Sequence, residues 1–460
     1  MSRPVMANTR RSPIALLKVQ RLKQRPFKGA DLLALILGLG SSFSLHLIGN
    51  IQASEILMLV LLPILLVIRV RGMMRPRMAL LLMLMFLWLF GQVMTDIYRG
   101  TAWFDWVRGD AAILFFGLNI IGLSLILGRD ERRIAIFYGA VAVSSLLQAR
   151  LQPVDAFWDQ PWKFGYGWGT TLLIVLVSCY FFHRRNYIIV GALLAGIVGV
   201  NLVMNFRSLV LALLVAMALV VPVVPEHIGR LRLLPRAGST ARVFVLAGFA
   251  LGAAGAAIGL VGMATKAGIV GAESKSKNQE QMQSGLGPLL SGRPEILVSS
   301  RAVMDSPILG HGSWAKGYKY LEMLTDLEVE NGIAVSLDYS EEMTEGFIPT
   351  HSHLMWAWVS AGILGAVFWT YVLSLALMGM VRAAVMRPAL APVYALTIFS
   401  FAWDILFSPF GTSRRITEAL LLVVVFNLLE SSSPIVQAPR EMIRKRMMGR
   451  FKSQAAIPAR

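Results

Sequence analysis

The sequence has few of the features on which soluble enzymes commonly rely. Only 15% of its 460 residues are charged, and its single cysteine, Cys179, lies within an apolar run, so neither a disulfide framework nor a cysteine-based metal site can form. The chain has no P-loop and no glycine-rich dinucleotide turn, and no Asp-x-Asp pair falls in the segments expected to face outward. Nucleotide sugars and ATP are therefore poor substrate candidates, and we expect no cofactor and no metal ion.

Apolar residues dominate instead. They make up 56% of the chain, and the mean hydropathy is +0.63. We therefore predict an all-α polytopic membrane protein with about twelve transmembrane helices. The apolar runs are 31–48, 53–70, 78–95, 110–127, 133–149, 169–183, 187–204, 208–225, 242–264, 353–380, 390–408 and 415–430.

The basic residues predict how these runs are oriented. A net charge of +18 would suggest nucleic-acid binding in a soluble protein, but about two thirds of the 44 Lys and Arg residues fall in the two tails and in every second short turn. Cytoplasmic segments of membrane proteins carry such an excess. We therefore expect basic cytoplasmic tails at 1–30 and 431–460, helices at 31–264 and 351–430, membrane lipids as neighbours and no nucleic-acid partner.

One long segment interrupts this regular succession. Residues 265–350 separate the ninth and tenth runs, are mixed in charge and are rich in Gly, Ser and Glu. Because loops beyond about 12–15 residues are usually functional or disordered, we predict a partly helical domain on the outer face. A second outward segment, 150–168, is dense in aromatic residues, about half of which we interpret as an interfacial belt.

The strongest local signals follow one another through the end of the long loop and into the tenth run. In order, they are Ser291-Gly-Arg293, Arg301, Pro307-Ile-Leu-Gly-His-Gly312 and His351, with Gly362 and Gly365 eleven and fourteen residues after His351. This succession resembles the O-antigen ligase and O-antigen polymerase superfamily of bacterial envelope glycosyltransferases. The sequence departs from that pattern at Ser352, where the family often has Asn, and at Leu297 or its neighbours, where a Trp is typical.

The resemblance implies an activity. It is the metal-independent, inverting transfer of a glycan from undecaprenyl diphosphate to an acceptor hydroxyl, on the periplasmic face of the bacterial inner membrane. We favour a ligase, with lipid A-core as the acceptor; a polymerase, whose acceptor is a second lipid-linked glycan, remains open. A flippase or transporter of lipid-linked oligosaccharides is a more distant alternative, because the candidate polar groups gather at one face rather than at mid-membrane.

The resemblance and the chemistry together select the site residues. Histidine titrates near pH 6.5 and can accept the proton of a hydroxyl, so His351 is the predicted catalytic base. A diphosphate leaving group needs cations, and the arginine fork suits phosphate. The candidates are Arg207, in an Asn-Phe-Arg-Ser stretch that resembles a short family element, Arg293 and Arg301, with Arg150, Arg414 and Arg415 as reserves.

Several of these residues also have a purely structural interpretation. His351 can simply cap the helix that follows it. Arg293 and Arg301 can balance Glu295 and Asp305 as exposed ion pairs, which contribute about 0–1 kcal/mol each. The sequence leaves these alternatives open.

Other polar residues near the same face are assigned to structure or left open. His353 is interpreted as structural and His311 as a loop residue. Asp404 lies within an apolar run and is a functional candidate for that reason. It can equally pair with Arg414 or Arg415 and hold the last two helices together, which we favour.

Overall fold

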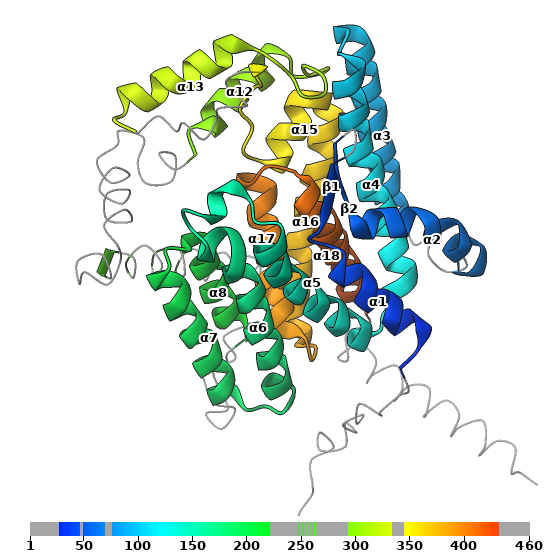
Figure 1. Ribbon diagram of the computed structural model, residues 1–460, viewed down its shortest axis with the longest axis vertical. Helices are drawn as coiled ribbons and strands as arrows, with labels where there is room; N and C mark the ends of the chain where they lie inside the picture. Colours follow the sequence, from blue (N-terminus) through cyan, green and yellow to red (C-terminus); the bar gives the residue numbers. More distant parts are fainter. Residues whose placement is uncertain are drawn as a thin grey trace, which may run out of the picture.

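A computed structural model describes residues 27–46, 49–69, 76–220, 293–333 and 345–431, with a few single positions between 248 and 263. Within these ranges the chain is helical apart from one short hairpin (Figure 1). The helices are α1 (Gly29–Leu39), α2 (Ala53–Arg69), α3 (Pro76–Arg99), α4 (Trp103–Leu127), α5 (Glu131–Leu151), η2 (Asp155–Phe157), η3 (Trp162–Tyr166), α6 (Gly167–His183), α7 (Tyr187–Val203), α8 (Arg207–Val220), α12 (Glu295–Asp305), α13 (Tyr318–Glu330), α15 (His353–Ala361), α16 (Ile363–Met386), α17 (Ala391–Phe407) and α18 (Thr412–Glu430).

These helices support the predicted class of an all-α membrane protein. Every predicted run except the ninth contains one of them, and the ninth, 242–264, lies outside the described residues apart from single positions. Within the described part, α3, α4, α5, α16 and the continuous helix Trp162–His183 are long and apolar enough to span a membrane. The count of twelve spans stays a prediction, because several of the other helices are shorter.

The first predicted run, 31–48, was wrong in its extent. Helix α1 ends at Leu39. Both the backbone N–H and the hydroxyl of Ser41 donate to the carbonyl of Gly38, at 3.3 and 2.7 Å, and so satisfy a carbonyl at the end of the helix. An antiparallel hairpin of β1 (Ser44–His46) and β2 (Asn50–Gln52) follows it. This hairpin brings polar side chains to a place where the sequence predicted apolar helix.

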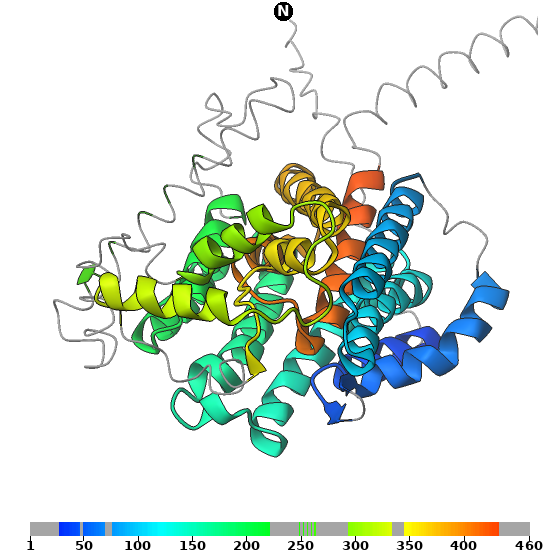
Figure 2. The same ribbon diagram turned by 90° about the horizontal axis from the view of Figure 1, so that it is seen from above.

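The bundle consists of two groups of helices that meet at α16 and α17. Helices α3, α4, α16 and α18 form one group, whereas α5, α6, α7, α8 and α17 form the other (Figure 2). Aromatic rings fill the first group: Trp88 stacks on Phe368 with ring centroids 4.9 Å apart, and Phe116 stacks on Trp369 at 5.7 Å. Such close packing fixes the ends of the helices, on which the polar site is built.

The described part of the long loop covers one end of this bundle. Helix α12 lies beside α15 at that end, and α13 packs against α12 (Figure 1). The chain that joins them is tied to α3, because the backbone and hydroxyl of Ser313 both donate to Asp96, each at 2.6 Å, and Arg99 donates to the carbonyl of Gly310 at 2.7 Å. Charge-assisted bonds of this kind hold the loop at a defined position on the bundle.

Glycines explain the close contact between this loop and the tenth predicted run. The run is not one helix: α15 ends at Ala361, and the next residue, Gly362, has a φ of +64°, which favours a residue without a Cβ. A Cβ on Gly362 would clash with the carbonyl of Ile308, and one on Gly310 would come within 2.7 Å of the amide nitrogen of Gly362. The Pro307–Gly312 turn therefore packs directly against the α15–α16 junction.

Candidate functional site

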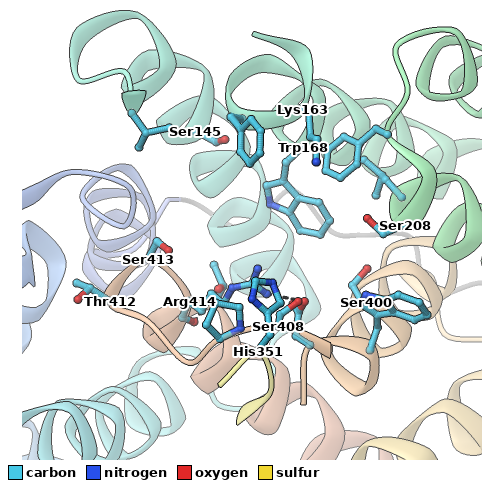
Figure 3. A pocket seen from close by; sticks show the side chains of 18 of the residues that line it. Ser145, Lys163, Trp168, Ser208, His351, Ser400, Ser408, Thr412, Ser413 and Arg414 are labelled. Atoms are coloured by element: carbon cyan, nitrogen blue, oxygen red, sulfur yellow. Dashed lines mark hydrogen bonds and ion pairs between the residues drawn. The ribbon is translucent and has the colours of Figure 1, made fainter. Parts of the chain in front are cut away.

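A cavity of about 1140 Å³ opens among the helix ends at this face. The ends of α5, α17, α18 and α8 line it, together with η3, the first hairpin and parts of α12 and α13 (Figure 3). Hydroxyl side chains make up much of the wall, and aromatic rings such as Trp168 and Trp403 interrupt them. A large cleft with a few converging polar groups is the usual form of a ligand site.

Charged side chains of both signs face this cavity. The cations are Lys163, Arg293 and Arg414, and the carboxylates are Glu295, Glu328 and Asp404. Figure 3 shows Arg414 next to His351, with Lys163 on the opposite side of the cavity. The cavity thus has both a cationic set that suits an anionic ligand and a histidine that can exchange a proton.

His351 lies on the segment that enters α15, with 33% of its side chain exposed, and its Nδ1 is 3.8 Å from Oε1 of Glu295. The pKa of His351 is lowered to about 4: burial is the largest cause, Glu295 opposes it, and the charges of Arg293, Arg414 and Lys163 add to the lowering. The imidazole is therefore neutral at pH 7 and has a nitrogen lone pair available to accept a proton.

The residues that follow His351 hold it in place. Ser352 caps α15 by accepting the backbone N–H of Met355 at 3.2 Å, and its hydroxyl donates to the carbonyl of Ile405 at 2.8 Å. His353 is fully buried, and its ring nitrogens lie 2.6 Å from the carbonyl of Ser408 and 2.5 Å from Oε1 of Glu418. His353 therefore has a structural role, as its interpretation from the sequence proposed, and Ser352 serves as a helix cap where the family pattern often has Asn.

Three of the predicted arginines lie at or beside the cavity. Arg293 and Arg414 line it, and Arg414 forms an ion pair with Asp404 at 2.5 Å. The pairing of Asp404 that the sequence favoured is thereby confirmed. Arg207 begins α8 between two lining residues, Phe206 and Ser208, and donates to the side chain of Asn205 at 3.0 Å.

The other three predicted arginines lie elsewhere. Arg301 is 58% exposed and pairs with Asp305 at 3.3 Å, which is the structural alternative weighed from the sequence. Arg415 is buried and binds Glu55 through two bonds of 2.7 and 2.8 Å, so it is held within the protein. Arg150 is exposed near the end of α5, and neither it nor the other two is among the lining residues. The placement of Arg301, Arg150 and Arg415 therefore does not support the prediction that they share one diphosphate site with the other arginines.

Sequence reasoning missed two charged residues of the cavity. Lys163 lies on η3, a single π-helical turn that leads into α6, and π-helical turns occur frequently at functional sites. Its aromatic surroundings in 150–168 were noticed, but they were interpreted in part as an interfacial belt. Glu328 on α13 is only 4% exposed, and burial together with the charge of Glu295 raises its pKa to about 7. Glu328 is one of several acidic residues along α13, and nothing in the sequence distinguished it from the others.

No three His, Cys, Asp or Glu side chains gather to hold a metal ion in the part of the chain that the structure describes. No protein-family model matches the chain, and neither a curated protein nor a solved structure matches it. The arrangement of His351, the three cations and the three carboxylates in one cavity therefore has to be interpreted from its own chemistry.

Proposed function

We propose that the protein transfers a glycan from undecaprenyl diphosphate to an acceptor hydroxyl, at the periplasmic face of the bacterial inner membrane. The observation that carries the proposal is that one cavity at the helix ends holds His351 together with Lys163, Arg293 and Arg414. A diphosphate leaving group develops negative charge as its bond to the sugar breaks, and preorganised cations stabilise that charge. The volume of about 1140 Å³ gives room for sugar and diphosphate together.

In the proposed step, the acceptor oxygen forms a bond to the anomeric carbon while the bond from that carbon to the diphosphate oxygen breaks. The electron pair of the broken bond leaves with undecaprenyl diphosphate, and the proton of the hydroxyl passes to His351. Attack from the face opposite the leaving group inverts the anomeric carbon. The donor already carries its leaving group, so the step uses no ATP, and the three cationic side chains supply the charge that a metal ion supplies in other transferases.

The donor itself would make His351 a better base. With the cavity empty, burial and the three cations keep the pKa of the imidazole at about 4. A bound diphosphate brings negative charge that offsets Lys163, Arg293 and Arg414, and a nearby anion favours the protonated imidazole. The pKa of His351 therefore rises when the donor binds, and proton transfer becomes easier at the moment when it is needed.

For the acceptor, we propose lipid A-core and hence a ligase. In the superfamily that the sequence resembles, polymerases often have an arginine followed eleven residues later by a glycine in two outer loops. Here one such match occurs, at Arg301 and Gly312, whereas Arg150 is followed at that distance by Pro161. Packing accounts for that match, because Arg301 pairs with Asp305 and a Cβ on Gly312 would come within 2.9 Å of Asp96. A polymerase is the second candidate, supported by the same cavity, because both reactions use the same donor.

The test is an in vitro transfer assay with purified protein in lipid nanodiscs and undecaprenyl diphosphate-linked glycan. One arm adds lipid A-core, and the other adds only more donor. The variants are His351→Ala and, as a matched control, His183→Ala, which removes an exposed histidine at the end of α6. General acid–base catalysis contributes about 10²–10⁴-fold, so His351→Ala should reduce the rate by that factor and His183→Ala should leave it unchanged.

The identity of the acceptor that receives the glycan distinguishes a ligase from a polymerase. Glycan on lipid A-core that is lost in His351→Ala supports a ligase, and a lengthened donor glycan supports a polymerase. If neither acceptor is modified but labelled donor crosses the bilayer of a proteoliposome, the protein is a flippase and the proposal of a transferase is wrong. Full activity of His351→Ala would contradict the role of the histidine.

A further inference from the structure

Glu295 is the carboxylate closest to the predicted base. It is the first residue of α12 and only 5% exposed, and its Oε1 lies 3.8 Å from Nδ1 of His351. A negative charge in the first turn of a helix is stabilised by the helix dipole. The loop domain therefore places a stabilised carboxylate beside the histidine, on the side of the cavity that it shares with Glu328.

We propose that Glu295 is a positioning residue for His351: it orients the imidazole and stabilises the imidazolium that forms when the acceptor hydroxyl loses its proton. The inference rests on the proposed function and adds to it a residue that neither the resemblance nor the sequence patterns had assigned to the reaction. Glu295 neither touches the sugar nor takes the proton in this scheme.

The geometry indicates how Glu295 would set the tautomer of His351. An imidazole that directs an Nδ1–H towards Glu295 has its lone pair on Nε2, so only one nitrogen remains to accept the proton of the acceptor. The distance of 3.8 Å is longer than a hydrogen bond, and hydrogen bonds of catalytic groups often tighten only when the substrate is bound. A shift of about 1 Å, well within the reach of a glutamate side chain, would complete the contact at the usual 2.7–3.2 Å.

The other charged groups of the cavity are less suited to this task. Lys163, Arg293 and Arg414 are cations and disfavour an imidazolium. Asp404 is engaged by Arg414 at 2.5 Å. Glu328 has a pKa of about 7, raised by burial and by the charge of Glu295, so it is partly protonated at neutral pH. The negative charge that faces His351 is therefore that of Glu295.

The experiment compares kcat and the donor KM of wild type, Glu295→Gln and, as a matched control on the exposed face of α13, Glu322→Gln. Glutamine keeps the shape of the side chain but removes its charge. We expect Glu295→Gln to lower kcat at least about tenfold, up to the loss that His351→Ala itself causes, with the donor KM changed by less than about threefold. Glu322→Gln should match wild type in both quantities.

Two further readouts separate positioning from a merely structural role. In the His351→Ala background, Glu295→Gln should cause no further loss, because residues that act as a unit are not additive. The acid limb of the kcat/KM profile of Glu295→Gln should move to lower pH, since the imidazolium has lost its neighbouring anion. Should Glu295→Gln fail to fold, Glu295→Asp, which keeps the charge but withdraws it by one methylene, should show an intermediate loss of kcat.

The outcomes distinguish this inference from the function on which it rests. Wild-type transfer that is lost in His351→Ala but intact in Glu295→Gln overturns the role of Glu295 alone. An equal loss from Glu295→Gln with and without His351 also overturns it, because the carboxylate would then act independently of the histidine. No transfer by the wild-type protein with either acceptor overturns the proposed function, and this inference with it.

Discussion

Two polar regions of this protein lie next to each other and use the same kinds of residue in opposite ways. Around His351, arginines, a lysine and carboxylates face open space in a cavity of about 1140 Å³. Around His353 and Arg415, the same residue types are buried and bind one another. Both oxygens of Glu55 accept from Arg415, and they also accept from Asn119 and from the backbone of Gln52, each at 3.0 Å.

The difference shows that residue type alone does not decide whether a charged side chain here is paired within the protein or faces a cavity. His351 and His353 are separated by one residue, yet a ring nitrogen of His353 is 2.5 Å from Glu418 whereas His351 is 3.8 Å from its nearest carboxylate. Side chains whose partners are all within the protein hold the helices together. Side chains that face a cavity can still bind a ligand. This distinction can be tested by mutating residues of either region.

The largest effect, a loss of stability, should come from removing one partner of the buried ion pair. Arg415→Ala leaves Glu55 as a buried carboxylate without its cation, and breaking a buried pair in this way costs about 3–5 kcal/mol. We expect a large fall in the unfolding temperature of the protein in detergent, measured by fluorescence-detected size exclusion. The double variant Glu55→Leu with Arg415→Leu should recover much of the loss, because no charge is then left unpaired. A stable Arg415→Ala protein would show that Arg415 is not a structural residue.

A smaller effect, on rate rather than on folding, should come from the cavity. Arg293→Ala removes a cation that lines it, and charge-assisted hydrogen bonds contribute about 1.5–3 kcal/mol, so transfer should fall by about 10- to 100-fold with the unfolding temperature unchanged. Arg301→Ala is the matched control from the same loop, since Arg301 is exposed and paired with Asp305. Equal losses in the two variants would argue against the cavity as the diphosphate site.

The smallest and most specific effect should be the pH dependence of transfer. The pKa of His351 is about 4 in the folded protein and near 6.5 when unfolded, so its contribution to stability is present above about pH 6.5 and is lost as the pH falls towards 4. Protonation also removes the base, so kcat/KM should fall on the acid side with a midpoint near pH 4. The midpoint for kcat should lie at higher pH, because bound diphosphate raises the pKa, and neither limb should remain in His351→Ala.

Much of the fold could be predicted because apolar runs and basic turns are direct consequences of the bilayer. The helices α2, α5, α7 and α17 begin and end within about two residues of their predicted runs. The run at 31–48 was misjudged because apolar composition does not reveal a turn of Gly and Ser residues in its middle. The break at Gly362 was missed as well, although the glycine itself had been singled out.

Only those residues of the site that a motif pattern or their expected place at the same face had selected could be predicted. Arg293 and His351 were found through a motif pattern, and Arg414 as a reserve near the same face. Lys163 and Glu328 come from segments far from that motif, and only the fold brings them to the cavity. Conversely, Arg415 satisfied the chemical criterion but binds Glu55, which is 360 residues away in the sequence, so nothing local indicated that pair. The pairing of Arg301 with Asp305, four residues on, had been weighed as an alternative.

The ion pair of Asp404 and Arg414 would have a consequence for the proposed reaction cycle. Both residues line the cavity, so Arg414 is neutralised while no donor is present, and a single small anion such as chloride has little to gain by displacing the carboxylate. A diphosphate carries more charge than one carboxylate and can compete for the arginine. If the protein catalyses the proposed transfer, Asp404 would pair with Arg414 again once the spent carrier departs, so the cavity would return to its starting state and would select a diphosphate over chloride.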